Sequence, residues 1–230
     1  MELSRIYFEL LEKYSPQGWW PVTPVGRCQG KLPEAPIYGI KTKNHKQRLE
    51  IILGAILTQN TQWKPNVERA IINLNKLNLI DINQILKVNH EILADAIKSS
   101  GYYNQKAKTL KNMAEFLKKH SVQNLKSMDT AKARDLLLSI NGIGPETADS
   151  ILLYALDKPI FVIDAYTRRI FGRINNKEYS YDELQNLFHK NISPEFCNEY
   201  HALLVEHAKQ HCKTKPICRD CPIKKFCSYA

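Results

Sequence analysis

Apolar residues recur at helical spacing along most of the chain. In residues 3–14 they are Leu3, Ile6, Tyr7, Leu10 and Leu11, and in residues 45–58 they are Leu49, Ile52, Leu53 and Ile56. Pro65 is placed to begin another helix, and the same spacing predicts helices near 81–88, 91–99, 104–120, 130–140, 165–171, 180–191 and 194–211. Alternating, strand-like patterns are poor throughout. The predicted fold class is therefore all-α.

A tight turn separates two apolar helical segments between Leu138 and Arg169. It reads Asn141-Gly142-Ile143-Gly144, and both glycines can take positive φ and let another backbone come close. Pro145 follows at the first position of the next helix, where its missing N–H is not needed. The free N–H groups at such a helix start can bind a phosphate. A Gly-x-Gly turn alone is more often an ordinary helix C-cap, so the turn needs further support.

The charge and the cysteines narrow the class of protein. Among 230 residues, 33 Lys and Arg face 23 Asp and Glu, a net charge of +10, which is common in proteins that meet a polyanion but also serves plain solubility. No apolar run reaches membrane-spanning length, and the start lacks the form of a signal peptide. We therefore expect a cytoplasmic protein, nucleoid-associated in a prokaryote, without a membrane partner. Six cysteines in a reducing compartment indicate ligands or buried thiols rather than disulfides.

Four of the cysteines form one C-terminal cluster with the spacing C-x5-C-x2-C-x5-C: Cys212, Cys218, Cys221 and Cys227. Structural zinc sites usually pair their ligands as two close C-x2-4-C units, and here there is one such pair. The wider spacing favours a [4Fe–4S] cluster, whose corners lie farther apart than the ligands of one ion, while zinc stays open. Cys28 and Cys197 lie outside this spacing and are interpreted as buried or incidental thiols.

The hairpin and the segment after it carry a resemblance. A helix, a Gly-Ile-Gly hairpin, a helix ending in Ala-Leu-Asp-Lys-Pro and then Val-Ile-Asp-Ala-Tyr-Thr-Arg-Arg resembles the helix-hairpin-helix DNA glycosylases of the endonuclease III superfamily. This resemblance implies a monomer that binds double-stranded DNA with a damaged base, and Asp164 as the catalytic carboxylate. It implies DNA contacts from the hairpin, from Lys106 and from two lysines of the cysteine segment: Gly142, Ile143, Gly144, Glu146, Thr147, Lys106, Lys215 and Lys224.

The resemblance also implies an organisation for the chain. One helical domain would comprise residues 45–157, the other residues 1–44 with 158–230, and the damaged base would enter between them. Iron–sulfur members of the superfamily carry C-x6-C-x2-C-x5-C at the C-terminus, which supports the [4Fe–4S] reading although one residue is missing from the first arm here. A carboxylate that precedes a helix, as Asp164 does, can also be its N-cap, and both roles can hold at once.

One branch of the superfamily is a closer match. Trp19-Trp20-Pro21, Leu57-Thr58-Gln59-Asn60-Thr61 and Gly101-Tyr102-Tyr103-Asn104 recur together with Gly-Ile-Gly-x-Glu-Thr-Ala-Asp in the 3-methyladenine DNA glycosylases. The resemblance implies that Trp19, or Trp20 beside it, and Trp63 sandwich the flipped base, with Gln59 and Asn60 in the same pocket. Alkylated purines such as 3-methyladenine are the implied substrates.

The residue at the position of a catalytic lysine predicts the type of chemistry. Bifunctional relatives have Gly-x-Gly-x-Lys-Thr-Ala, and here Glu146 stands where the lysine would be; a carboxylate cannot form a Schiff base. We expect monofunctional base removal without AP lyase activity. Ala55 offers no acid where mismatch-specific adenine glycosylases have one. Excision of mismatched uracil or thymine or of oxidised bases, with or without lyase activity, stays open, as does a binding module without chemistry, which would have no use for Asp164.

Overall fold

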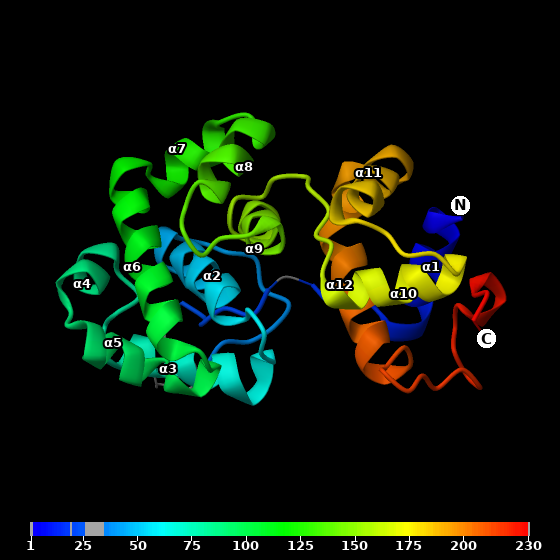
Figure 1. Ribbon diagram of the computed structural model, residues 1–230, viewed down its shortest axis with the longest axis horizontal. Coiled ribbons are helices and arrows are strands. Elements are labelled where there is room, and N and C mark those ends of the chain that lie inside the picture. Colours follow the sequence, from blue (N-terminus) through cyan, green and yellow to red (C-terminus); the bar gives the residue numbers. More distant parts are fainter. Residues whose placement is uncertain (1, 19, 26–34, 230) are drawn as a thin grey trace. The chain divides into compact units, whose positions relative to one another are not determined.

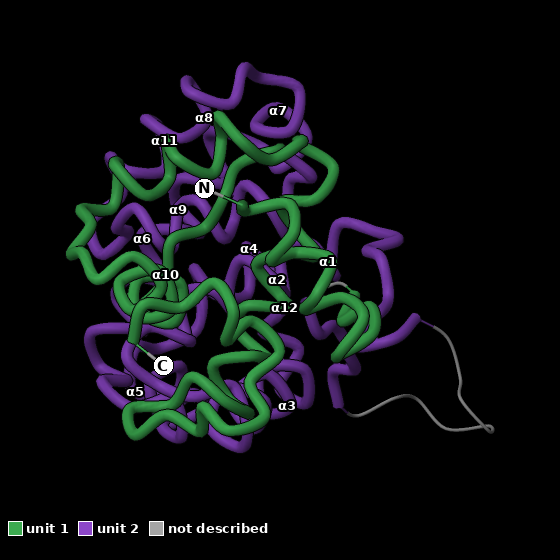
Figure 2. The backbone as a smooth tube through the Cα atoms, turned by 90° about the vertical axis from the view of Figure 1, so that its right-hand side faces the viewer, with its two compact units in different colours: residues 1–19, 159–230 green, residues 20–158 purple. Residues whose placement is uncertain are grey.

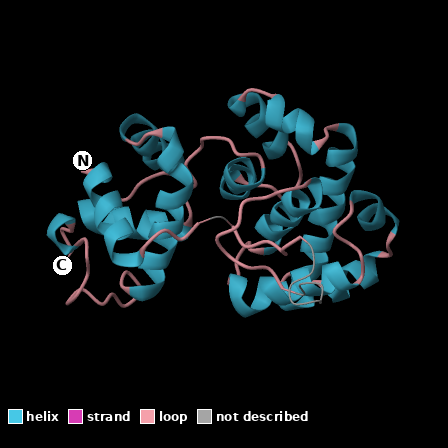
Figure 3. Ribbon diagram, turned by 180° about the vertical axis from the view of Figure 1, so that it is seen from behind, coloured by secondary structure: helices cyan, strands magenta, loops and turns pink. Residues whose placement is uncertain are grey.

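The computed structural model describes residues 2–18, 20–25 and 35–229, and these residues are helical with no named strand (Figures 1 and 3). Their one β-type pairing is an isolated antiparallel bridge between Val22 and Ile37. The all-α prediction is confirmed. None of the described helices is long and apolar enough to cross a membrane.

The chain divides into two compact units, residues 1–19 with 159–230 and residues 20–158 (Figure 2). The expected domain boundary lay at residue 45, but the described part of residues 20–44 packs with the second of these units. Thr23 explains the difference, because its N–H and its hydroxyl both donate to Glu50 Oε1, at 2.7 and 3.0 Å. Burial raises the pKa of Glu50, while these donors and Asn75 counteract the rise.

The unit of residues 20–158 is built around α2. Residues 49–57 of α2 are all buried, and the helix packs against α3, α6, α7 and α9 (Figure 1). The helices are α2 (His45–Leu57), α3 (Glu68–Lys76), α4 (Ile82–Lys87), α5 (His90–Ala96), α6 (Tyr103–Lys119), α7 (Val122–Ser127), α8 (Thr130–Leu138) and α9 (Pro145–Ser150). After α9 the chain continues as a π-helical turn, Ile151–Ala155.

Polar side chains begin many of these helices. Asn44, Asp81, Asn89, Ser121 and Asp129 each accept a backbone N–H in the first turn of the helix that follows. Each cap satisfies a donor that the helix itself cannot. The cap at Ser121 marks α7, a helix that the periodicity did not predict because its six residues bury just Val122 and Leu125.

The other unit packs four helices on an aromatic core. They are α1 (Leu3–Tyr14), α10 (Ala165–Asn175), α11 (Tyr181–Asn191) and α12 (Cys197–Gln210). Phe161 stacks on Phe188 with ring centroids 3.7 Å apart, and Tyr200 packs edge-on against both. The Tyr200 hydroxyl donates to Leu3 O at 2.9 Å, which satisfies a buried polar group and joins α12 to α1.

Candidate active site, hairpin and cysteine loop

Asp164 lies at the start of α10 and is its N-cap. The Thr167 N–H donates to Asp164 Oδ1 at 2.7 Å, and the residue is 9% exposed. The other oxygen, Oδ2, lies 3.6 Å from Nε2 of His201 on α12. Burial by itself raises the pKa of Asp164, but His201 and the Thr167 N–H outweigh burial and hold that pKa below its usual value. The predicted cap is therefore confirmed, and it presents an ionised carboxylate.

The two glycines of the hairpin between α8 and α9 differ in conformation. Gly142 has φ +94°, and a Cβ there would lie 2.3 Å from Thr109 Oγ1, so this position requires glycine. Gly144 has φ −99° and ψ 177°, an extended backbone that any residue can adopt, and a Cβ there would meet nothing within 4 Å. Gly142 therefore uses the positive φ that glycine allows, and Gly144 does not.

The hairpin turns its carbonyl groups toward the protein. Asn112 Nδ2 donates to Asn141 O at 3.2 Å, and Gln59 Nε2 donates to Gly142 O and to Thr147 Oγ1, both at 2.9 Å. The N–H groups of Gly142 and Gly144 donate to no acceptor among the described residues. Gln59, expected in the base pocket, uses its amide nitrogen to hold the hairpin. The arrangement leaves N–H donors open at the start of α9.

A buried ion pair joins the two helices of the hairpin. Arg134 of α8 binds both carboxylate oxygens of Asp149 in α9, at 2.7 and 3.1 Å, and Asp149 is fully buried. Removing one partner would leave a buried charge, so the pair fixes α8 against α9. Sequence reasoning missed it, although the spacing of 15 residues across a tight hairpin could have suggested it. Glu146, in the first turn of α9, is exposed, whereas Ile143 and Thr147 are buried.

Lys106 was expected among the DNA contacts, and that expectation is wrong. The residue is 3% exposed, and its ammonium donates to Leu57 O at 2.8 Å and to Ser100 O at 2.7 Å. Burial lowers the pKa of Lys106 to about 8. Lys106 therefore ties the end of α2 to the turn before α6 and presents no charge to a phosphate. Lys215 and Lys224 are exposed.

Trp20 and Trp63, which pack on α2, do not leave a slot between their rings for a flipped base. Trp20 and Trp63 meet edge to face, with ring centroids 5.8 Å apart and planes at 87°. Both rings pack on Gly54, where a Cβ would lie 3.2 Å from Trp63 and 3.3 Å from Trp20. A base cannot stack between two rings in this arrangement, so the expected Trp20–Trp63 sandwich is wrong for the structure described. Trp19 lies outside the described residues. Asn60 is exposed, with φ 54°.

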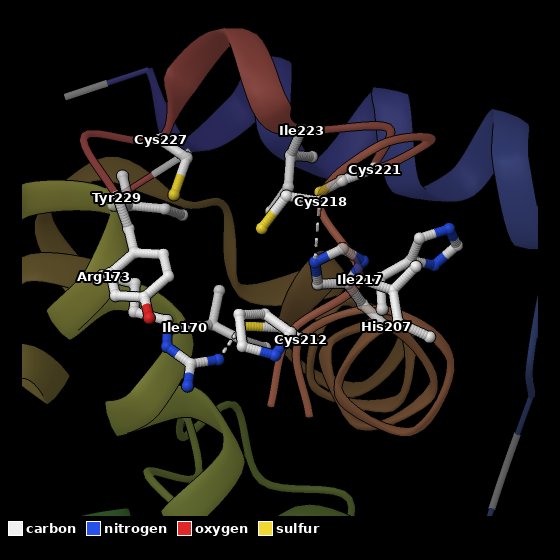
Figure 4. Close-up of a pocket in the computed structure, with 13 residues that line it drawn as sticks. Ile170, Arg173, His207, Cys212, Ile217, Cys218, Cys221, Ile223, Cys227 and Tyr229 are labelled. Atoms are coloured by element: carbon white, nitrogen blue, oxygen red, sulfur yellow. Dashed lines mark hydrogen bonds between the residues drawn. The ribbon is translucent and has the colours of Figure 1, made fainter. Parts of the chain in front are cut away.

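The cysteine loop lies against α10 and α12. Cys212, Cys218, Cys221 and Cys227 line one pocket, whose wall includes Ile170, Ile174 and Ile223 (Figure 4). Arg173 of α10 donates to Cys212 Sγ at 3.2 Å, to Lys213 O at 2.7 Å and to Thr214 O at 2.9 Å. Arg169 donates to Cys212 O at 2.9 Å.

The donor set of this pocket suits an iron–sulfur cluster. Cys212, Cys218, Cys221 and Cys227 share the pocket, and within the described ranges no three His, Cys, Asp or Glu side chains are grouped to hold a single metal ion. A cubane needs thiolates at separated corners, an apolar wall and hydrogen bonds to sulfur. Cys28 lies outside the described residues, and Cys197 is buried in α12, where burial raises its pKa to about 11.

Comparison with known proteins identifies the family. Residues 53–194 match the model of the HhH-GPD superfamily base excision DNA repair proteins. A protein of Methanocaldococcus jannaschii with the provisional name DNA repair glycosylase is 45% identical, over 98% of this chain and 95% of its own length. Endonuclease III of Sulfolobus acidocaldarius is 35% identical over 77% of this chain and 80% of its own.

A solved structure agrees with the sequence relatives. The 3-methyladenine DNA glycosylase of H. pylori, bound to 1,N6-ethenoadenine, superposes with a TM-score of 0.70 at 29% identity, over 91% of this chain and 98% of its own. The resemblance to endonuclease III-like glycosylases is confirmed. The chain belongs to the HhH-GPD superfamily of base excision DNA repair proteins and is a DNA glycosylase of that superfamily.

Proposed function

We propose that this protein is a monofunctional glycosylase that removes alkylated purines such as 3-methyladenine from double-stranded DNA and leaves an abasic site. The observation that carries the proposal is the exposed carboxylate of Glu146 in the first turn of α9, at the position where bifunctional relatives place a lysine. A carboxylate cannot attack the sugar as an amine does, so no Schiff base forms there. Base removal then proceeds by hydrolysis.

Asp164 is the catalytic residue in this proposal. The flipped nucleotide loses its base when the C1′–N bond breaks and both bonding electrons leave with the base. The sugar then carries oxocarbenium charge, which an ionised carboxylate stabilises. Asp164 suits this role because its pKa lies below the usual value despite burial. A water oxygen adds to C1′ and gives up its proton, with Asp164 as the acceptor or orienting group.

An alkylated purine matches these residues because its charge makes it a good leaving group. The glycosylase then needs no separate acid to protonate the base. Stacking of an electron-poor ring on tryptophan adds about 0.5–2 kcal/mol by cation–π attraction, so the lability of the lesion must supply the rest of the selectivity. Trp63 is half-buried, and its ring is the proposed stacking surface. The similarity to the 3-methyladenine glycosylase of H. pylori supports this substrate class.

DNA binding is assigned to the hairpin and to the cysteine loop. The open N–H groups of Gly142 and Gly144 and the start of α9 suit a backbone phosphate, and such contacts carry no sequence information. Lys215 and Lys224 are exposed on the cysteine loop and add positive charge. Affinity should therefore contain a part that is independent of sequence and falls with salt.

The cysteine loop would hold one [4Fe–4S] cluster through Cys212, Cys218, Cys221 and Cys227. When bound, such a cluster crosslinks the loop through four thiolates and supplies no acid or base for hydrolysis. Arg173 and Arg169 already connect the loop to α10, the helix that Asp164 caps. These contacts connect the start of the cysteine loop to α10, the helix whose N-cap is the proposed catalytic residue.

The test is a panel of duplexes that each contain one lesion. Methylated purines, 1,N6-ethenoadenine, uracil, thymine opposite guanine and an oxidised pyrimidine are incubated with the protein, then treated with or without alkali. We expect release of 3-methyladenine from methylated DNA and strand breaks that need alkali, with no covalent adduct under borohydride. Asp164→Asn is the inactive control. Ready excision of uracil or mismatched thymine with methylated DNA untouched contradicts the substrate, and efficient borohydride trapping contradicts monofunctionality.

A further inference from the structure

The two oxygens of the Asp164 carboxylate have different surroundings. Oδ1 accepts the Thr167 N–H at 2.7 Å and is committed to the cap of α10. Oδ2 faces His201 Nε2 at 3.6 Å, and the two side chains are 13% and 8% exposed. A contact of this length is longer than a good hydrogen bond but within range of a charge interaction, and catalytic contacts commonly tighten when substrate binds. Oδ2 is thus the oxygen left for chemistry, with an imidazole beside it.

His201 is itself fixed by the core of its unit. It lies on α12 next to the fully buried Tyr200, and its ring meets Phe161 edge to face, with centroids 6.4 Å apart. Phe161 precedes Asp164 by three residues and is held at both backbone groups: its N–H donates to His189 Nε2 and its carbonyl accepts from Gln185 Nε2. The same packed core therefore fixes the positions of the His201 imidazole and the Asp164 carboxylate.

Asp164 needs a neighbouring group that favours its ionised form and fixes the direction of its free oxygen. A carboxylate that stabilises a sugar cation must be ionised and must aim one oxygen at the sugar, and burial opposes ionisation. His201 is the side chain that offsets burial most at Asp164. The buried Thr167 hydroxyl lies beside the same carboxylate and, like the Thr167 N–H, lowers the pKa of Asp164.

We propose that His201 is the positioning residue for Asp164: its imidazole, held by the core of its unit, fixes the direction of the carboxylate oxygen that the helix cap leaves uncommitted. This inference rests on the proposed function, because it takes Asp164 as the residue that does the chemistry. His201 touches neither sugar nor base and acts through Asp164. Loss of this contact, which substrate binding would tighten into a hydrogen bond to a charged group, should slow base release about 10- to 100-fold without weakening DNA binding.

The test compares single-turnover release of 3-methyladenine from methylated duplex DNA, with the affinity for a duplex that contains a stable abasic analogue measured alongside. His201→Leu removes the ring nitrogens and should lose about 10- to 100-fold in rate, with affinity unchanged within about twofold. His201→Gln places an amide nitrogen near the position of Nε2 and should recover most of the rate. His201→Asn is too short and should behave like His201→Leu. If His201→Leu fails to fold, the comparison of the Gln and Asn variants carries the test.

Two further variants separate the possible causes of a loss. Ser180→Ala removes the cap of α11 in the same unit, whose hydroxyl accepts the Glu183 N–H, and should lower the unfolding temperature while the folded protein keeps its rate within about threefold. In an Asp164→Asn background, His201→Leu should cause no further loss. The positioning role is overturned if His201→Leu turns over like wild type, or if rate and affinity fall together in all His201 variants and in Ser180→Ala. Wild-type turnover by Asp164→Asn alone overturns the proposed function instead.

Discussion

Gly144→Asp should weaken DNA binding without lowering the stability of the fold. Gly144 is the N-cap of α9, its backbone is extended at φ −99° and ψ 177°, and a Cβ would meet no atom within 4 Å. Aspartate is among the preferred N-cap residues and exceeds glycine by a few tenths of a kcal/mol. The variant should therefore unfold at the same temperature as wild type or slightly above it.

The effect on DNA binding has the opposite sign. The new carboxylate would stand where the proposed phosphate binds, and two unit charges at about 5 Å interact with about 1–3 kcal/mol at an effective dielectric constant between about 80 and 20. That energy corresponds to about a 5- to 150-fold loss of affinity for damaged and undamaged duplexes alike. The slope of log affinity against log salt concentration should also become shallower by the contribution of about one phosphate contact.

Fluorescence anisotropy with a lesion-free duplex at two salt concentrations, paired with thermal unfolding, measures both effects. Asn89→Asp is the matched control, because it adds one negative charge at the N-cap of α5, whose Asn89 side chain already accepts the Glu91 N–H. It should keep affinity within about twofold of wild type. If Gly144→Asp binds DNA as tightly as Asn89→Asp, the hairpin does not contact a phosphate and the assignment is wrong.

Four further predictions test other parts of the structure. Gly142→Ala should lower the free energy of unfolding by about 1–3 kcal/mol through strain at φ +94° and the clash with Thr109, and Thr109→Ala should restore part of it; an unchanged urea midpoint contradicts this. Anaerobically purified protein should be brown and hold four irons, whereas colourless protein with one tightly bound zinc refutes the cluster. Because burial lowers the pKa of Lys106 to about 8, the folded state releases that proton first, so stability relative to Lys106→Met should rise between about pH 8 and 10.5; parallel curves refute this. Trp63→Ala should strongly reduce 3-methyladenine release while affinity for undamaged DNA stays within about twofold, and a silent variant makes Trp63 ordinary core.

Features set by local sequence could be predicted. Helical periodicity identified most of the helices, and Asp164 was recognisable as a cap because it directly precedes the first turn of α10. The short α7 escaped because two buried residues give too little periodicity. Which hairpin glycine takes positive φ could not be predicted, since Thr109, far away in the chain, closes the space at Gly142 and leaves Gly144 open.

Features set by distant contacts could not be predicted. A lysine is normally exposed, and the sequence does not show that the carbonyl groups of Leu57, 49 residues away, and Ser100, six residues away, accept hydrogen bonds from the Lys106 ammonium. The angle between Trp20 and Trp63 is likewise a packing result, since both rings settle on Gly54. The sequence could indicate that Gly54 allows close approach, but not that the approaching rings would meet edge to face.

The proposed catalytic and phosphate-binding groups both depend on which side chain, if any, accepts the N–H groups in the first turn of a helix. Asp164 accepts an N–H of α10, and this bond holds one of its oxygens while His201 stands beside the other. At α9 the cap is Gly144, which has no side chain to accept an N–H, although α2, α4, α5, α7 and α8 all begin with a side chain that does. The carbonyl groups of the hairpin are meanwhile bound by Asn112 and Gln59, and Arg134 fixes α8 against α9. The open donors of α9 are therefore rigid before DNA arrives, so a phosphate can bind without the ordering cost that a loose loop would incur.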